Sequence, residues 1–380
     1  MAKSQGRSVS LNTEIVLPDD VIIEILTWLP VKSLLKFKCV CRSWRALISS
    51  RRFIKAQLEN SKSAPNLARE MLAIDSGIRS DKLKVCSVNS MLYESAPQVF
   101  DVSYPLDLGS CCMMVACCDG LLLLRSKKRE MILWNPSTRT WKTLPHFDLK
   151  FNIPEFDLGY DKSSDDYKVV GFPDDPETIV IVYSLRNDEW KRIKDINGQA
   201  IPYGALANGK LYCFIEPLFI DDWENFEPEA ELIYDWEILS LDLEKEEIEI
   251  LQMPSFVKVT DRSSLAVSEG SLFLLCPHLS KTHADVWILD GCSVGNGNWT
   301  KVVTMPCCPD GGWTYGFRFH SNLLYVQKNN GLVIFSGQGV DFVVYDAKDG
   351  SFRYHHIRDI GQYGRGTSHT YFESLVSPLG

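Results

Sequence analysis

Repetition constrains the fold of this 380-residue chain more than any other feature. Four runs align as a strand, a tight turn at Gly or Asn, and a second strand. Gly and Asn tolerate the positive φ that tight hairpin turns require. The runs span residues 113–124, 203–212, 264–273 and 316–325, with a looser copy at 156–170. Their first strands lie about 40 to 60 residues apart, a spacing typical of propeller blades.

Each unit continues with two further strands that share a signature. The third strand ends in an acid or Asn and the fourth begins with an aromatic residue, as in Asn135 before Trp141 and Asp346 before Phe352. The unit around Asp242 keeps the acid but has no aromatic residue at that point. Four strands per unit match one blade of a β-propeller.

A partial unit and a lone strand complete the set of blades. Strand-like runs at 70–75 and 83–88 precede the complete units, and the segment 368–377 follows them. Pairing this last segment with the first run would close a ring and remove exposed sheet edges. We therefore expect six blades over residues 70–380, with two packed β-sheets as the alternative.

Residues 14–60 predict short helices instead of strands. Pro18 and the two acids after it suit a helix N-terminus, and Pro30 ends this helix. Further helices are expected over 32–38, 39–49 and 50–59. The apolar face of the first helix consists of Val21, Ile22, Ile25, Leu26 and Leu29. So small an element cannot cover its apolar surface alone, and part of it must meet the ring or a partner.

The predicted fold class is therefore α+β multidomain, a small helical module followed by an all-β propeller. The helical module covers residues 14–60, and the propeller covers 70–380. The polar residues 1–13 are expected to be disordered, and 61–69 to form a linker.

The helical module resembles an F-box over residues 17–58. Two Leu-Pro steps, at Leu17 and Leu29, flank an apolar helix, and the run Val40-Cys41-Arg42-Ser43-Trp44 follows. An F-box docks a Skp-type adaptor, which couples a receptor to a cullin scaffold. We expect exposed apolar groups on the first two helices, with Val40, Trp44 and Ile48 supporting or joining them. The implied adaptor-binding residues are Leu17, Pro18, Ile22, Leu26, Leu29, Pro30, Leu34, Leu35, Val40, Cys41, Trp44 and Ile48.

The rest of the chain is similar to the plant F-box-associated, kelch-like domain. The runs 119–124, 133–139 and 371–378 carry this similarity, although the double glycine of kelch repeats is absent. Together the two resemblances imply a non-catalytic substrate-recognition subunit of an SCF-type ubiquitin ligase. A propeller enzyme and a ligase-independent scaffold are the alternatives.

Charge points to protein partners. The net charge of −9 does not favour nucleic acid. Residues 14–60 hold eight Lys and Arg and five Asp and Glu, so the helical module is +3. From 216 to 237 nine acids occur without Lys or Arg, interleaved with Trp and Tyr. A solvated loop is one interpretation; the other is a site for a basic protein target. The predicted target-binding residues are Asp221, Asp222, Trp223, Glu224 and Glu227.

The motifs do not predict catalysis, a metal or a cofactor. The run 291–295 matches a nucleophile elbow in form, but Asn296-Gly297-Asn298 cannot begin the helix which that motif needs. The cysteine pairs at 111–112 and 117–118 flank an apolar strand, where free Cys acts as a small buried hydrophobe. We expect neither a metal site nor a cofactor.

The N-terminal residues 1–13 lack the apolar segment of a secretory signal. The most apolar run, 111–124, is interrupted and too short to span a bilayer. We therefore expect reduced thiols, no membrane association, and a location in the cytoplasm, the nucleus or both.

Overall fold

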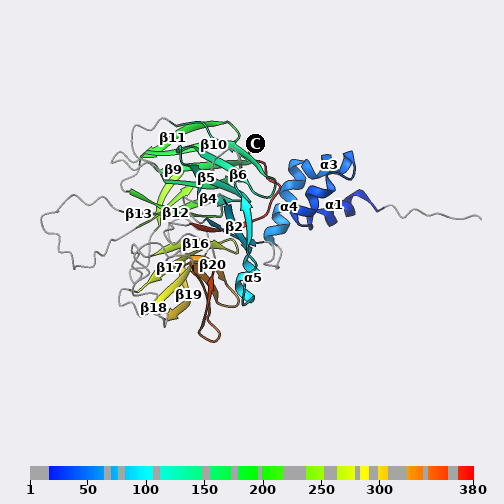
Figure 1. Cartoon of the computed structure of the whole chain (residues 1–380). Coiled ribbons are helices and arrows are strands. Elements are labelled where there is room, and N and C mark those ends of the chain that lie inside the picture. The colour runs from blue at the N-terminus through cyan, green and yellow to red at the C-terminus, as the bar shows by residue number, and fades with distance from the viewer. Residues whose placement is uncertain are drawn as a thin grey trace, which may run out of the picture.

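The computed structural model places four helices beside one face of a ring of strands (Figure 1). It describes residues 17–63, 70–75, 82–105, 112–147, 155–172, 179–195, 199–216, 237–251, 263–278, 283–290, 298–306, 323–336, 341–357 and 367–380.

The four N-terminal helices follow the predicted order, with small shifts at their ends. They are α1 (Asp19–Thr27), α2 (Val31–Phe37), α3 (Arg42–Ser49) and α4 (Arg51–Ser63). Pro18 and Pro30 stand directly before α1 and α2, where their missing N–H removes no helical hydrogen bond. Helix α3 begins later than predicted because Cys41 caps it and accepts a hydrogen bond from the Trp44 N–H at 3.4 Å.

Helix α4 runs past the predicted end at residue 59 and includes the first three residues of the predicted 61–69 linker. Gln57 and Ser61 are buried and joined by a 3.0 Å hydrogen bond between their side chains. Lys62, on the next turn, reaches a carboxylate of the ring. These tertiary contacts extend the helix beyond its apolar pattern. The rest of the linker and residues 1–13 lie outside the described residues.

The strands form six four-stranded antiparallel sheets, which confirms the predicted six blades. The first blade contains β24 (Ser368–Phe372), β1 (Glu70–Asp75), β2 (Lys82–Ser87) and β3 (Phe100–Ser103). The second contains β4 (Cys112–Cys118), β5 (Leu121–Ser126), β6 (Met131–Asn135) and β7 (Thr140–Thr143). The third contains β8 (Glu155–Asp161), β9 (Asp166–Phe172), β10 (Ile179–Ser184) and β11 (Glu189–Asp195).

The remaining three blades follow in chain order. The fourth contains β12 (Gln199–Ala207), β13 (Lys210–Glu216), β14 (Glu237–Asp242) and β15 (Glu247–Leu251). The fifth contains β16 (Ser264–Ser268), β17 (Ser271–Pro277), β18 (His283–Asp290) and β19 (Asn298–Pro306). The sixth contains β20 (Leu323–Gln327), β21 (Leu332–Ser336), β22 (Asp341–Asp346) and β23 (Ser351–His356).

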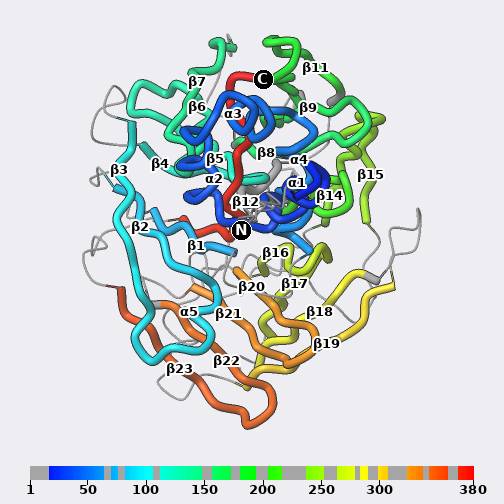
Figure 2. The backbone as a smooth tube through the Cα atoms, turned by 90° about the vertical axis from the view of Figure 1, so that its right-hand side faces the viewer, coloured from blue at the N-terminus to red at the C-terminus, as the bar shows by residue number. Residues whose placement is uncertain are grey.

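The last strand closes the ring, as predicted. Strand β24 pairs antiparallel with β1, with Ser368 opposite Ile74 and Phe372 opposite Glu70. The innermost strands β24, β4, β8, β12, β16 and β20 each contact the next around the ring, which Figure 2 shows from the side of the helices. The first blade therefore joins the two ends of the propeller in one hydrogen-bonded sheet.

The propeller buries its apolar side chains between neighbouring blades. Six clusters of buried residues each join two adjacent blades, one cluster for each seam around the ring. A seventh cluster belongs to the helical element and contains Leu26, Leu34 and Phe53. Each sheet thus packs on both of its faces, as stacked sheets with alternating side chains do.

Three of the predicted hairpins turn at the expected residues. The turns Asp119-Gly120, Asn208-Gly209 and Glu269-Gly270 have positive φ at both positions, as a tight hairpin turn between twisted strands requires. In the last blade the prediction is wrong. Strand β20 begins at Leu323, so the residues expected to form a second strand form the first, and the hairpin turns at 328–331. Asn residues occur at both places, so composition alone does not distinguish them.

A short helix, α5 (Val88–Tyr93), occurs in the first blade and was not predicted. Ser87 caps it by accepting a hydrogen bond from the Ser90 N–H at 3.0 Å. Val88, Met91 and Leu92 are buried in the seam between the first and sixth blades. Six residues are too few to show a helical period, so packing is what defines this helix.

Candidate functional site

The outer side of α1 carries a stripe of exposed apolar side chains. Val21, Ile25 and Trp28 are 38 %, 50 % and 43 % exposed, and their spacing of four and three residues places them on one side of the helix. We call these three residues the α1 stripe. Leu17 and Val40, at 48 % and 62 %, are exposed on the same helical element. An exposed apolar surface of this kind is typical of a protein-binding site.

The predicted adaptor-binding residues differ in burial. The exposed ones are Leu17, Pro18, Pro30, Val40 and Cys41, and the partly buried ones are Ile22, Leu29, Leu35 and Trp44. The prediction that Leu26 and Leu34 are exposed is wrong, because both lie in the core of the helical element together with Ile48. The apolar face of a helix can be wider than the core it packs against. One edge of that face is then buried, and the other edge stays exposed.

The adaptor-binding set predicted from the sequence did not include the α1 stripe. Val21 and Ile25 belong to the apolar face predicted for this helix, and Trp28 does not. The available signal was the breadth of the apolar face, which includes neighbouring pairs such as Val21 and Ile22. Adjacent residues on a helix point about 100° apart, so a face that includes such a pair is broad; here Ile22 packs against the core while Val21 is exposed.

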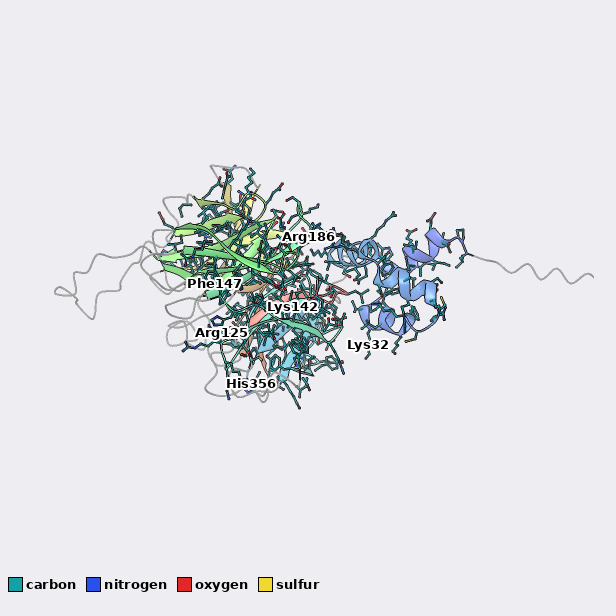
Figure 3. The ribbon with its side chains drawn as sticks, turned by 90° about the horizontal axis from the view of Figure 1, so that it is seen from above. Lys32, Arg125, Lys142, Phe147, Arg186 and His356 are labelled. Carbon is teal, nitrogen blue, oxygen red and sulfur yellow. The ribbon has the colours of Figure 1, made fainter. Side chains whose placement is uncertain are left out.

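Exposed cations lie on the two helices that follow α1, whereas α1 itself carries exposed acids at Asp19, Asp20 and Glu24. Lys32 and Lys36 on α2 and Arg42 and Arg45 on α3 are exposed, and Figure 3 shows Lys32 on the helices, apart from the ring. The excess of positive charge expected from composition therefore lies on the surface of the helical element. It favours an acidic partner and suppresses contact with a basic one.

Cys41 joins the surface at the start of α3. Its thiol lies 3.0 Å from the Ser43 hydroxyl and accepts the hydrogen bond from the Trp44 backbone. These two hydrogen bonds lower the pKa of the Cys41 thiol. The Trp44 ring packs edge-on against Phe37, with ring centres 5.6 Å apart, which fixes α2 against α3.

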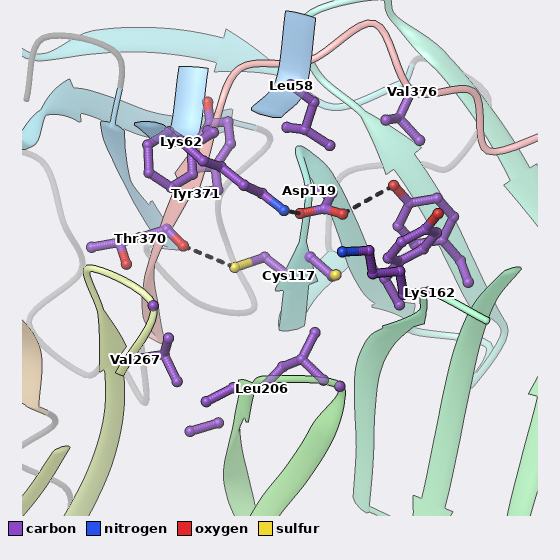
Figure 4. Close-up of a pocket in the computed structure, with 18 of the residues that line it drawn as sticks. Leu58, Lys62, Cys117, Asp119, Lys162, Leu206, Val267, Thr370, Tyr371 and Val376 are labelled. Carbon is purple, nitrogen blue, oxygen red and sulfur yellow. Dashed lines mark hydrogen bonds and ion pairs between the residues drawn. The ribbon is translucent and has the colours of Figure 1, made fainter. Parts of the chain in front are cut away.

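Helix α4 attaches the helical element to the propeller through ion pairs. Lys62 Nζ lies 2.7 Å from Asp119 in the second blade, and the Asp119 side chain is only 8 % exposed (Figure 4). Burial alone would lower the pKa of Lys62, but the charge and hydrogen bond of Asp119 raise it. Lys55 and Arg51 pair with Asp165 in the third blade at 2.7 and 3.2 Å. The helix is thus fixed to two adjacent blades.

The C-terminal tail after β24 is a second attachment. Leu375 is 3 % exposed and belongs to the core of the helical element, while its neighbour Val376 packs with Leu58 in a seam of the ring. Neighbouring residues of an extended segment point to opposite sides, so the tail can contribute to both cores at once. The core of the F-box-like helices therefore contains a residue from the last part of the chain.

Asn135 holds this tail in place. It is fully buried, and its Nδ2 donates to the backbone oxygens of Ser374 and Val376 at 3.1 and 2.7 Å. Its Oδ1 accepts from the N–H groups of the following turn, so the amide uses both of its ends. Gly120 stands beside the tail with φ +83, and a side chain there would collide with Ser374.

A cavity of about 1910 Å³ lies between α4 and the centre of the ring. Its lining comes from α4, from the turns that end the innermost strands, and from β24 and the tail. Glu70 and Glu269 line this cavity; burial and the charge of Glu269 raise the pKa of Glu70 to about 7. Cys117 is half-buried and donates to the Thr370 oxygen at 3.1 Å, and desolvation raises its pKa to about 12, which keeps the thiol protonated and unreactive.

The predicted target-binding residues Asp221, Asp222, Trp223, Glu224 and Glu227 lie outside the described residues. The strands that flank them are described. Strand β13 begins at the turn 208–209, which lines the cavity below α4, and it runs to Glu216 at the opposite side of the ring. Figure 1 shows β13 on the side of the propeller away from the helices.

Among the described residues, none of the helices has the length and apolarity needed to cross a membrane. No three His, Cys, Asp or Glu side chains of these residues gather closely enough to hold a metal ion. Cys111, the run 291–295 and the asparagines after it fall outside or at the border of the described ranges.

Two family models match the chain. The F-box associated beta propeller domain matches residues 77–378, and the F-box domain matches residues 16–56. An F-box/kelch-repeat protein of Arabidopsis thaliana is 27 % identical over 375 residues, covering 95 % of this chain and 96 % of the relative. The F-box protein CPR1 of the same plant is 26 % identical over 325 residues, covering 76 % of this chain and 73 % of the relative.

The helices match the F-box model and the closed six-bladed ring matches the propeller model, so the class is that of F-box proteins with a propeller domain. The chain belongs to the family of F-box proteins that carry the F-box associated beta propeller domain. Both resemblances inferred from the sequence are thereby confirmed. Among solved structures, YjhT aligns with 75 % of this chain and 98 % of its own at a TM-score of 0.39 and 11 % identity, a likeness that bears on no conclusion.

Proposed function

We propose that this protein is a substrate-recognition subunit of a cullin-based SCF-type ubiquitin ligase. Its F-box docks a Skp-type adaptor, and its propeller binds the protein to be ubiquitinated. The observation that carries the proposal is the α1 stripe, an exposed apolar surface on an element that is anchored to the ring by its other side. Family members of this type generally act as substrate adaptors, and the chain itself would be non-catalytic.

The anchoring through α4 and the tail suits such a receptor. A bound target would stand at a fixed distance and orientation from the adaptor, which raises the effective concentration of its lysines near the transferring enzyme. A flexible link would spread the target over a much larger volume. The ion pairs of Asp119 and Asp165 and the shared core at Leu375 all act against such flexibility.

The F-box side of the ring is already partly covered by α4 and the tail. We therefore place target binding on parts of the ring that these elements leave free, including the side where β13 ends and β14 begins. The acidic segment between these strands remains our proposal for contact with a basic target, with Asp221, Asp222 and Glu224 as its charged centre. We place the protein in the cytoplasm, the nucleus or both, where the ligase machinery would meet it.

Adaptor docking is tested by changing the α1 stripe. Ile25→Ala combined with Trp28→Ala should weaken the affinity for a Skp-type adaptor at least about tenfold, because each side chain loses apolar area that docking would bury. Isothermal titration calorimetry with the purified adaptor measures this change.

Ile250→Ala is the matched control, since Ile250 is 46 % exposed on β15 of the fourth blade, far from the F-box along the chain. It should leave the adaptor affinity unchanged. Equal affinities of the double variant and the unchanged protein, with both folded by circular dichroism, would contradict the assignment.

A further inference from the structure

The C-terminal tail, residues 373–380, lies between two cores and forms neither a helix nor a strand of its own. Leu375 belongs to the cluster that the inner sides of all four N-terminal helices form, and Val376 belongs to a seam of the ring. Figure 2 shows this segment, drawn in red, passing beside α2 and α3. The position of the tail is therefore set by both cores together.

On the side of the helices, the tail makes apolar and charged contacts. Leu375 packs in one cluster with Leu26 of α1 and Leu34 of α2. Burial raises the pKa of Glu373, and the nearby charge of Lys32 on α2 acts in the opposite direction. A helical element this small is only marginally stable without cover. Loss of Leu375 would thus loosen the helix that presents the α1 stripe.

On the side of the ring, one turn of the second blade holds the tail. The Ser374 hydroxyl donates to the backbone oxygen of Asp119 at 2.6 Å, and Asn135 donates to the tail backbone. The carboxylate of the same Asp119 pairs with Lys62 of α4, and Figure 4 shows this pair near Val376. The tail and α4 are therefore fixed at the same place.

The closing strand leads directly into this tail. Phe372, the last residue of β24, lies opposite Glu70 of β1, and the tail begins with the next residue. Helix α4 also contacts β24. Release of the tail from the F-box core would therefore remove support from the end of β24. Segments that lose contacts together open together, as local unfolding of one cooperative unit.

We propose that adaptor docking and closure of the propeller stabilise each other through the tail, with Leu375 as the positioning residue between them. An adaptor bound at the α1 stripe favours the folded helices, and these favour the docked tail and the paired β24. The coupling is reciprocal, so a closed ring raises the affinity for the adaptor by the same factor.

This inference rests on the proposed docking of a Skp-type adaptor and adds a condition to it. A receptor whose first blade is open lacks a complete F-box core and binds the adaptor weakly. Assembly of the ligase would then favour chains whose target-binding ring is closed.

The test is amide hydrogen exchange of the full chain, read by mass spectrometry, with and without a saturating Skp-type adaptor. We expect exchange of the β24 amides to slow at least about fivefold when the adaptor binds, the lower end of typical coupling between two sites. Strand β14 belongs to the fourth blade and serves as the reference. Its exchange should not change.

Two variants of the tail separate coupling from simple packing. Leu375→Ala should weaken adaptor affinity about tenfold and remove most of the slowing at β24. Leu379→Ala is the matched control, since Leu379 is exposed in the same tail, and it should preserve both. If Leu375 only stabilised the helices, the variant would lose affinity but keep the slowing at saturating adaptor, and this result would overturn its positioning role.

The coupling is also tested from the helices without the adaptor. Leu34→Ala opens space in the F-box core and should speed exchange at β24 several-fold, while β14 keeps its rate. Val40→Ala, at an exposed position of the same element, should leave both rates unchanged. Unchanged β24 exchange in Leu34→Ala, or in the unchanged protein on adaptor binding, would overturn the proposal.

The two proposals can fail separately. If the unchanged protein does not bind the adaptor, the proposed function is rejected, and Leu34→Ala still decides whether the two cores are coupled. If the adaptor binds tightly and β24 exchange stays the same, the docking proposal stands and the coupling is rejected.

Discussion

The helical element and the propeller differ in how they cover their apolar surface. Between Leu17 and Val40 five large apolar side chains are exposed, whereas the whole described propeller exposes five others. Each blade has a neighbour on both sides, so sheet faces are covered in turn around the closed ring. The helices have such cover on one side only, which is why their other side is available to a partner.

The helical element nevertheless depends on the ring for part of its core. Leu375, seven residues after the first residue of β24, lies among the F-box helices. The α4 helix passes from this core at Phe53 to a seam of the ring at Leu58. The two domains are separate segments of the sequence, but their cores pack against each other without a break.

The largest expected effect comes from removing the closing strand. Deletion of residues 368–380 takes away β24 and the tail, leaving β1 without its inner partner and the F-box core without Leu375. Unpaired strand edges favour aggregation. We expect the melting temperature of the ring to fall sharply and aggregation to begin on heating, measured by scanning calorimetry and light scattering.

Deletion of 373–380 alone is the matched control, since it keeps β24 and therefore the ring closure. It should preserve a folded propeller while it weakens the helical element. An unchanged melting curve for the longer deletion would show that closure does not stabilise the ring.

A smaller and more local effect is expected from Leu375→Asp. A charge in the F-box core should destabilise the helical element by roughly 3–5 kcal/mol, the range for losing a large buried apolar group, and more if the carboxylate stays ionised. Limited proteolysis should then cut within α1–α4 while the ring resists, and adaptor affinity should fall with it.

Leu379→Asp is the control, because Leu379 is 62 % exposed in the same tail. It should behave like the unchanged protein in both measurements. If α1–α4 resist the protease in Leu375→Asp, the F-box core does not depend on the tail, and the helical element and the ring are independent domains.

The smallest effect concerns the interior of the ring. Burial raises the pKa of Asp157 on β8 to about 7, although the N–H groups of Leu158 and Gly204 act in the opposite direction. Because the folded pKa is higher than the unfolded one near 4, the neutral form is favoured by folding. Stability from this group is therefore present below about pH 4 and is lost as the pH rises through 7.

Asp157→Asn removes the titration and keeps one acceptor oxygen, which can serve the Leu158 N–H that bonds Oδ1 in the unchanged protein. The unfolding free energy of the unchanged protein should fall between pH 4.5 and 8. We expect it to fall by about 1–3 kcal/mol less in the variant. Urea unfolding at several pH values measures it. Parallel pH profiles for both proteins would mean that Asp157 is not the source of this dependence.

Much of the fold could be predicted from local patterns. Turn residues such as Asp119-Gly120 and Asn208-Gly209 located the hairpins, because positive φ limits the choice of residues. The last blade was misplaced, since Asn residues occur in both segments that could turn. Helix α5 was missed because its residues are helical mainly through burial of Met91 and Leu92 in a seam.

The candidate sites divide in the same way. The order of Leu-Pro steps and the Val-Cys-Arg-Ser-Trp run identified the F-box, but it did not tell Leu26 and Leu34, which are buried, from Ile25 and Trp28, which are exposed. Periodicity predicts which side of a helix is apolar. It does not predict which edge of that side packs against the core.

The sequence is sufficient to predict the six-unit repeat, the positions of most turns, the closing strand and the F-box order of residues. These depend on short-range rules of backbone conformation and on spacing that is visible along the chain. Three further features follow from the folded ring: Leu375 completes the F-box core, Asn135 holds the tail, and Val21, Ile25 and Trp28 remain exposed. Burial depends on what the folded ring brings alongside each side chain, and no local pattern contains that information.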